Sequence, residues 1–262
     1  MITLYHNAAS TCSQKVRFVL AEKGLDYESR EIDLVGGAQH EADYVKLNPN
    51  HVVPTLVHGG NVFIESTLIN EYLEDAFPNC PLRPEDAGGR HAMRLWTKRI
   101  DELHPNAGVL TFSIGTRPMI LQRSEEERNA LIDQIPDPKR RALRRSVIEC
   151  GVKAPEFPPA LHAFLATLDQ MQADLSEREW LAGSCLSLAD AAALPYVMRL
   201  DHLAMTPFLE ERPRIADWYA RMRARPSFET AVASLLPPFV IEMFQKNGTA
   251  VWSDVESLAY DR

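Results

Sequence analysis

Four small polar side chains follow one another near the start of the chain, in the stretch Ser10-Thr11-Cys12-Ser13. They stand between a predicted strand and a predicted helix, and N–H groups at the start of a helix stabilise a negative charge. The three hydroxyls can donate to that charge, and Cys12 is a candidate nucleophile whose thiol pKa is lowered there. The competing interpretation is structural, because Ser and Thr favour N-cap positions and Cys is commonly buried. The spacing alone leaves both interpretations open.

Two dipeptides further along are candidate ligand contacts, Val53-Pro54 and Glu65-Ser66. Proline is common where a strand begins, whereas a cis bond there would turn the backbone of Val53 outward to pair with an extended peptide. Glu65 and Ser66 begin a predicted helix, where a carboxylate and a hydroxyl are ordinary capping groups. The same pair can hold the ammonium and the carboxylate of one ligand. Each dipeptide is weak support when taken alone.

These candidates all lie in a segment where strand and helix patterns alternate. Apolar and turn residues predict, in order, a strand, a helix, a strand, a helix, a hairpin of two strands and a closing helix. Their ranges are 2–5, 12–23, 27–34, 39–47, 54–57, 61–64 and 65–76. A βαβ unit followed by a hairpin and a helix is the thioredoxin-like arrangement. We therefore predict a thioredoxin-like α/β domain over residues 1–78.

The remainder of the chain has a helical pattern, which predicts a linker over 79–86 and an all-α domain over 87–262. Residues 122–156 are a polar insertion of two helices joined at Pro136 and Pro138. Its basic cluster, which runs from Lys139 to Arg145, is expected to be a solvated face paired with the acidic cluster at 125–127, although an anion site is the alternative. The stretch Ser187-Leu188-Ala189-Asp190 predicts a capping box that serves folding.

Composition removes several classes of function. The 262 residues carry a net charge of −8, which disfavours nucleic acid and anionic membranes as general partners. No apolar run of about 18 residues exists, and the N-terminus does not resemble a secretory signal. The four cysteines are far apart, so we expect no disulfide framework, no metal site and a cytoplasmic location. Nucleotide-binding, P-loop and hydrolase motifs are absent from the sequence.

Four motifs in order resemble the glutathione transferase superfamily over nearly the whole chain. The stretch from Ser10 to Arg17 is similar to the SSCSxRVR motif of zeta-class enzymes, and that from Asn48 to Leu56 to an NPxxxVPxL segment. The stretch from Glu65 to Leu73 resembles an ESxxIxxYL helix, and residues 180–190 resemble a C-terminal folding motif. Other segments are similar to the bacterial glutathione-dependent β-aryl etherases, and Cys12 is similar to a cysteine of reductive dehalogenases.

The resemblance implies roles for the candidate residues. The backbone of Val53, before a cis-like Pro54, would pair with the cysteinyl part of glutathione. Glu65 and Ser66 would hold the γ-glutamyl ammonium and carboxylate. Gln39 or His40 would reach the glycyl carboxylate. Ser10 matches the serine that hydrogen-bonds the thiolate, with Thr11, Cys12, Ser13 and backbone N–H groups as the alternatives.

The resemblance also implies a reaction, in which a glutathione thiolate attacks a small hydrophobic electrophile in a cleft between the domains of a homodimer. The expected wall residues are Leu103, Leu110, Phe112, Ile114, Arg117, Phe239 and Trp252. The alternatives are aryl ether cleavage, glutathione-dependent isomerisation or dehalogenation, and a noncatalytic glutathione-binding or scaffold module. A thiol–disulfide reductase is a weaker alternative, because Ser10 stands at the position of the redox cysteine.

Overall fold

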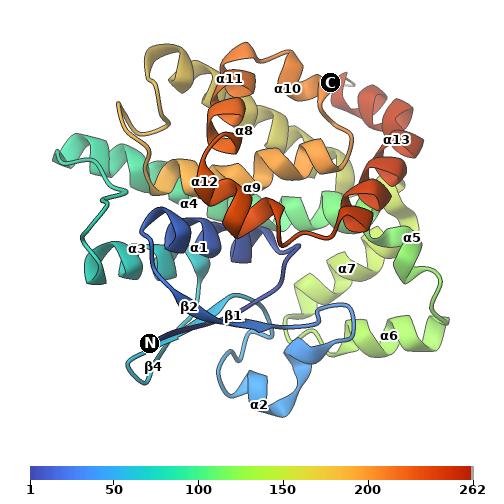
Figure 1. The fold of residues 1–262 in the computed structure, drawn as a ribbon. Coiled ribbons are helices and arrows are strands. Elements are labelled where there is room, and N and C mark those ends of the chain that lie inside the picture. Colours follow the sequence, from blue (N-terminus) through green and yellow to red (C-terminus); the bar gives the residue numbers. More distant parts are fainter. Residues whose placement is uncertain (261–262) are drawn as a thin grey trace. The chain divides into compact units, whose positions relative to one another are not determined.

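The computed structural model describes residues 1–260, and its first elements follow the predicted order (Figure 1). They are β1 (Ile2–His6), α1 (Thr11–Glu22), β2 (Tyr27–Glu31), η1 (Ala38–His40), α2 (Ala42–Val45), β3 (Thr55–His58), β4 (Asn61–Phe63) and α3 (Ser66–Ala76). The four strands form one sheet in the order β2-β1-β3-β4. The β1–β2 pair is parallel, and the β1–β3 and β3–β4 pairs are antiparallel. The thioredoxin-like arrangement predicted for this segment is confirmed.

Alternating burial explains why β1 lies in the middle of the sheet. Ile2, Leu4 and His6 are buried, and the residues between them are only partly so. The helices α1 and α3 contact each other and lie on one side of the sheet, with α2 on the other (Figure 1). On the α2 side, Tyr44 packs in a small cluster with Ile32 and Val53. The sheet therefore has helices on both of its sides, and the side chains of Ile2, Leu4 and His6 lie on its more deeply buried face (Figure 1).

Local chemistry moves three of the predicted boundaries. The strand predicted to reach residue 34 ends at Glu31, and the Asp33 carboxylate then accepts the N–H groups of Val35 and Gly36 to turn the chain. The helix predicted over 39–47 is interrupted at Glu41, which is extended (φ −66°, ψ 141°). In the hairpin only residues 59 and 60 form the turn, since both need positive φ (58° and 81°) and both are glycine.

Helices make up the chain from residue 87 to 260. They are α4 (Ala87–Leu110), η2 (Thr111–Gly115), α5 (Arg117–Ile120), α6 (Glu125–Asp133), α7 (Pro138–Cys150), η3 (Gly151–Lys153), α8 (Phe157–Glu177), α9 (Leu188–His202), α10 (Pro207–Glu210), α11 (Pro213–Arg223), α12 (Pro226–Phe228), η4 (Glu229–Ala233) and α13 (Pro238–Tyr260). Both η2 and η4 are π-helical. The predicted α/β plus all-α fold class is confirmed.

The chain divides into two compact units. The first comprises residues 1–101, 174–195 and 217–236, and the second comprises 102–173, 196–216 and the chain from Pro237 onward. The boundaries 1–78, 79–86 and 87–262 stay a prediction. No single helix within residues 1–260 is long and apolar enough to cross a membrane. The pair Pro226–Ala233 and Pro238–Tyr260 reaches that length and composition only together, across a bend of 84°.

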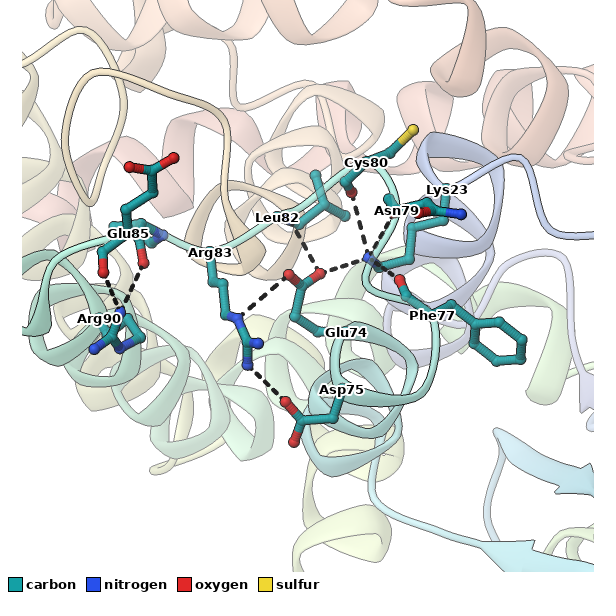
Figure 2. Close-up of polar contacts among 11 residues, drawn as sticks. Lys23, Glu74, Asp75, Phe77, Asn79, Cys80, Leu82, Arg83, Glu85 and Arg90 are labelled. Atoms are coloured by element: carbon teal, nitrogen blue, oxygen red, sulfur yellow. Dashed lines mark hydrogen bonds and ion pairs between the residues drawn. The ribbon is translucent and has the colours of Figure 1, made fainter.

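In the first unit, the segment predicted to be a linker is held in place by a buried ion pair (Figure 2). The Lys23 ammonium lies 2.6 Å from the Glu74 carboxylate, and both side chains are almost fully buried. Lys23 also donates to three backbone carbonyls, those of Phe77, Asn79 and Cys80. Glu74 accepts the N–H of Leu82, and Arg83 forms an ion pair with Asp75. The chain leaving α3 is thus anchored to α1 by charge.

Asp190 joins three segments of the first unit. It is fully buried and accepts hydrogen bonds from Leu181 N (3.1 Å), Ser187 N (3.0 Å) and Trp218 Nε1 (2.9 Å). The predicted reach of Asp190 back to Ser187 is therefore present. The Ser187 hydroxyl departs from the predicted box because it accepts from Ala189 N, two residues on.

The polar insertion forms two helices, α6 and α7, as predicted. Asp137 caps α7, and Pro138 takes its first position, where a missing N–H costs nothing. Arg145 pairs with Asp133 of α6 at 3.0 Å, so its partner lies outside the acidic cluster at 125–127 that the prediction names. The prediction of a solvated basic face is wrong for Arg144, whose guanidinium lies over the ring of Phe112. The helical period places Arg144 on the side of α7 that faces η2.

Candidate functional site

The four polar residues at the start of α1 differ in what they can reach. Ser10 is the N-cap, with φ −73° and ψ 120°, and its oxygen accepts the N–H of Ser13 at 3.3 Å. Its own O–H hydrogen is left to donate elsewhere. Ser13 is fully buried and accepts from Asn7 N, and Thr11 is 7% exposed. Ser10 and Cys12 are therefore the two whose side chains are only partly buried.

Arg17 holds the loop that carries Ser10. Its guanidinium is fully buried and donates to the carbonyls of Asn7 (2.9 Å), Ala8 (3.0 Å) and Ala231 (2.7 Å). Burial lowers the pKa of Arg17 to about 10, so it stays charged at neutral pH. Three carbonyls fixed by one planar cation leave the backbone before Ser10 little freedom. Sequence reasoning assigned Arg17 no role, and its only local signal was a cation on the apolar side of a helix.

His6 completes this buried network. Arg17 Nη1 lies 3.1 Å from His6 Nδ1, and because arginine only donates, Nδ1 must be the accepting nitrogen. The hydrogen therefore sits on Nε2, which donates to Ser29 Oγ at 2.7 Å. Burial, followed by the charge of Arg17, lowers the pKa of His6 to about 4. The fold thus requires a neutral imidazole at this position.

A pH dependence of stability follows from His6. The folded pKa of about 4 lies below the ordinary value of 6.5, so the unfolded chain binds the proton more readily. Stability from this group is complete above pH 6.5 and is lost as the pH falls toward 4, by up to about 3 kcal/mol at 1.4 kcal/mol per pKa unit. Urea unfolding at pH 7 and pH 4.5 measures the loss. His6→Gln, which keeps an acceptor and a donor, should show a smaller loss, and equal losses would contradict the assignment.

The segment before Pro54 is fixed from behind by two side chains. The Val53–Pro54 peptide bond is cis, as the resemblance implied. The Tyr44 hydroxyl donates to the carbonyl of Val52 at 2.6 Å, and Asn48 Nδ2 donates to the same oxygen at 2.9 Å. Two donors on one carbonyl hold this turn next to β3. Sequence reasoning did not assign either Tyr44 or Asn48 to the site.

Glu65 and Ser66 stand at the start of α3 in an unusual backbone geometry. Glu65 has φ 67° and ψ 106°, a left-handed conformation that a non-glycine residue adopts only at a cost. Its carboxylate is exposed, with Asn50 Nδ2 at 3.4 Å from Oε1. Ser66 is 6% exposed. Strained backbone of this kind clusters at ligand sites, which motivates a functional hypothesis for the pair.

A buried lysine supports the same end of α3. Lys15 is fully buried, and its ammonium lies 2.9 Å from Thr67 Oγ1 and 3.0 Å from Asp101 Oδ1. Thr67 in turn donates to Asp101 at 2.7 Å. This triad links α1, α3 and α4 directly behind Ser66. Asp101, which pairs with Lys15, lies 86 residues further along the chain, so no local sequence pattern could identify the pair.

Gln39 and His40 lie in a short polar cluster with His51. His40 Nδ1 is 2.8 Å from His51 Nδ1, and His40 Nε2 is 3.0 Å from Gln39 Nε2. In this hydrogen bond one of the two facing ring nitrogens carries the hydrogen and donates, and the other accepts. His51 has a positive φ of 54°. The structure thus adds His51 to the two residues that the sequence proposed for the glycyl carboxylate.

The expected wall residues belong to different surroundings. Leu103, Leu110 and Ile114 are buried in the core, whereas Phe239 is 67% exposed. Within the second unit, Arg117 donates to the carbonyls of Ile148 (2.8 Å) and Glu149 (3.0 Å). The Phe112 ring lies against the guanidinium of Arg144, and the ring of Trp252 packs against that of Phe208 with centroids 5.1 Å apart. Their role as walls stays a prediction. Across the residues that the structure describes, no group of three His, Cys, Asp or Glu side chains could hold a metal.

Comparison with known proteins matches both parts of the chain. Residues 9–76 match the family model of the glutathione S-transferase N-terminal domain, and residues 153–221 that of the C-terminal domain. A tetrachloro-p-hydroquinone reductive dehalogenase from Sphingobium chlorophenolicum is 31% identical, over 88% of this chain and 95% of that protein. Glutathione S-transferase 3 from Zea mays is 30% identical, over 90% and 96%. The crystal structure of the β-etherase LigF from a Sphingobium strain superposes with a TM-score of 0.79 at 28% identity, over 94% and 99%.

Proposed function

The chain belongs to the glutathione S-transferase family, and on this premise we propose that Ser10 stabilises the thiolate of glutathione for attack on a small hydrophobic electrophile. The observation that carries the proposal is the geometry of Ser10. Its oxygen is engaged by Ser13 N, its O–H hydrogen is available, and it stands at the N-terminus of a twelve-residue helix. A donated hydrogen bond and the helix dipole both favour the thiolate and lower the thiol pKa.

The remaining contacts of the proposal are those that the family resemblance implies. The backbone of Val53, next to the cis bond, pairs with the cysteinyl residue of glutathione. Glu65 and Ser66 hold the γ-glutamyl ammonium and carboxylate, with Lys15 and Asp101 supporting them, and Gln39 or His40 meets the glycyl carboxylate. The thiol proton goes to solvent, the sulfur forms a bond to the electrophilic carbon, and a leaving group departs with its electron pair.

Glutathione binding tests the proposal directly. At millimolar concentration, glutathione should raise the melting temperature of the wild type by mass action. Ser66→Ala should weaken glutathione binding at least tenfold and abolish the shift, since a hydrogen bond to a charged carboxylate is worth about 1.5–3 kcal/mol. Differential scanning fluorimetry and isothermal titration calorimetry measure the two effects. Ser253→Ala, at an exposed serine of α13, should behave as the wild type. A wild type that neither binds nor is stabilised by glutathione would refute the proposal.

A second candidate activity is the cleavage of aryl ethers, which the similarity to the β-etherase structure favours. Here the thiolate displaces a phenolate from the carbon that bears the ether oxygen. Reductive dehalogenation is the third, because the first relative named above is a dehalogenase and Cys12 is partly accessible. Incubation with glutathione and one substrate at a time distinguishes these activities by product. An aryl ether tests ether cleavage, a haloaromatic tests dehalogenation, and a cis-dienoate tests the isomerisation that the resemblance also implied.

We also propose that the protein is a cytoplasmic homodimer, as the family implies. Light scattering tests the dimer.

A further inference from the structure

Arg144 of α7 is a cation without an anionic partner. Its Cζ lies 3.1 Å from the centroid of the Phe112 ring. With the residues of the described chain, 1–260, it forms no hydrogen bond or ion pair. Arg144 is partly exposed, and two buried arginines differ from it, since Arg17 donates to three carbonyls and Arg199 donates to Thr111 Oγ1 at 3.2 Å. The hydrogen-bond donors of Arg144 are therefore available to solvent or to a ligand.

The charges around Arg144 also favour the binding of an anion. Burial, followed by the charge of Arg140 one turn earlier, lowers the pKa of Arg144 to about 9. Burial also lowers the pKa of Arg140, whereas the negative charge of Asp137 raises it. Arg144 has no such carboxylate opposing the shift. Both arginines remain charged at neutral pH, so two neighbouring cations lie in a partly buried region. Partial burial of two like charges is unfavourable, and an anion bound beside them would relieve it.

The surroundings of Arg144 suit a flat, aromatic anion. Phe112 covers one face of the guanidinium, and the N–H groups point outward in the plane of the group. That edge matches the two oxygens of a carboxylate, which accept a bidentate pair of hydrogen bonds. Phe112 lies in η2, a π-helical turn that contacts α7. Such turns inside helical segments occur frequently at functional sites.

We propose that Arg144, with Phe112 against its face and Arg140 one turn away, is an anion-binding subsite for an aromatic carboxylate or an ionised phenol. Arg144, Arg140 and Phe112 belong to the second unit of the chain, whereas the residues proposed to hold glutathione belong to the first. We assign this anion to the electrophilic substrate, an assignment that rests on the proposed function. The substrate class is then a hydrophobic electrophile that carries an oxyanion on an aromatic ring.

Calorimetric titration of the full-length protein tests the subsite with three probes: benzoate, 4-nitrophenolate at pH 8, and benzamide as the neutral equivalent of benzoate. The wild type should bind at least one anion more tightly than benzamide. Arg144→Met should weaken binding of that anion at least tenfold and leave benzamide unchanged, and Arg144→Lys should retain part of the affinity. Lys139→Met removes the same charge from an exposed position on the same helix and should bind as the wild type does. Which anion binds decides between a carboxylate and a phenolate.

The outcomes separate the subsite from the proposed function. Equal binding of anions and benzamide to the wild type would overturn the subsite, and so would equal anion affinity in Arg144→Met and Lys139→Met. Glutathione affinity measured in each variant reports whether the protein is folded. If the anion binds at Arg144 while charged and neutral haloaromatics are conjugated with unchanged preference in Arg144→Met, its assignment to the substrate is wrong. A wild type that binds the anion but not glutathione would refute the proposed function alone.

Discussion

Ser10→Ala should lower the rate of glutathione conjugation to a chlorinated aromatic by about 10²–10³-fold. A preorganised donor aimed at a developing negative charge is worth about that much when it is removed. Ser10 is suited to this role because the N–H of Ser13 occupies its oxygen and leaves its hydrogen free to donate. The pH profile of the rate should shift to higher pH, since the pKa of the bound thiol rises when the donor is lost. Steady-state kinetics and the ultraviolet absorbance of bound thiolate measure both effects.

Two variants serve as controls for Ser10. Ser10→Thr keeps the hydroxyl and the cap, so it should retain most of the rate. Cys12→Ala removes the neighbouring thiol and should leave conjugation nearly unchanged, while it would matter to a reaction that passes through a mixed disulfide. An unchanged rate in Ser10→Ala would transfer the role to Thr11, to Ser13 or to the backbone N–H groups. Burial of Ser13 and Thr11 favours the backbone among these.

Arg17→Met should cost about 4 kcal/mol of unfolding free energy, although the side chain of methionine fills similar space. The substitution removes the charged donor from the carbonyls of Asn7, Ala8 and Ala231, and a hydrogen bond to a charged group contributes about 1.5–3 kcal/mol. Gln14 Nε2 still donates to Ala8 and Ser10 N to Asn7, which keeps the total loss below the sum of three such bonds. It also frees His6 from its partner, so the pKa of His6 should rise toward its ordinary value. Chemical denaturation measures the loss, and the histidine titration is followed by NMR.

Arg30→Met is the matched control for Arg17. Arg30 is an exposed arginine of β2, paired with Glu28 at the surface, and such pairs contribute little. Its loss should change stability by less than about 0.5 kcal/mol. Arg17→Lys keeps the charge but cannot reach three carbonyls with one planar group, so it should fall between the wild type and Arg17→Met. A loss below about 1 kcal/mol in Arg17→Met would show that water replaces the guanidinium, contrary to its complete burial.

The order of elements and several of their ends are local properties, and the sequence predicted them. Apolar alternation in β1, the stripe of Val16, Val19 and Leu20 in α1, and the Gly59-Gly60 turn each act within a few residues. Ser10 as an N-cap follows the same rule. The errors also have local causes. The side chain of Asp33 turned the chain earlier than the apolar pattern did, and an extended Glu41 divided one predicted helix into two pieces.

By itself, the sequence determined the thioredoxin-like and helical parts, the family and a set of candidate residues around glutathione. Only the tertiary structure decided which polar side chains are buried and what they hold. Arg17 contacts Ala231, Lys15 contacts Asp101, and Arg144 lies over the ring of Phe112. Each of these contacts joins residues that are far apart in the chain, and the cost of burying a charge depends on those partners. Periodicity identifies the inner face of a helix, but it does not show which cation on that face is compensated.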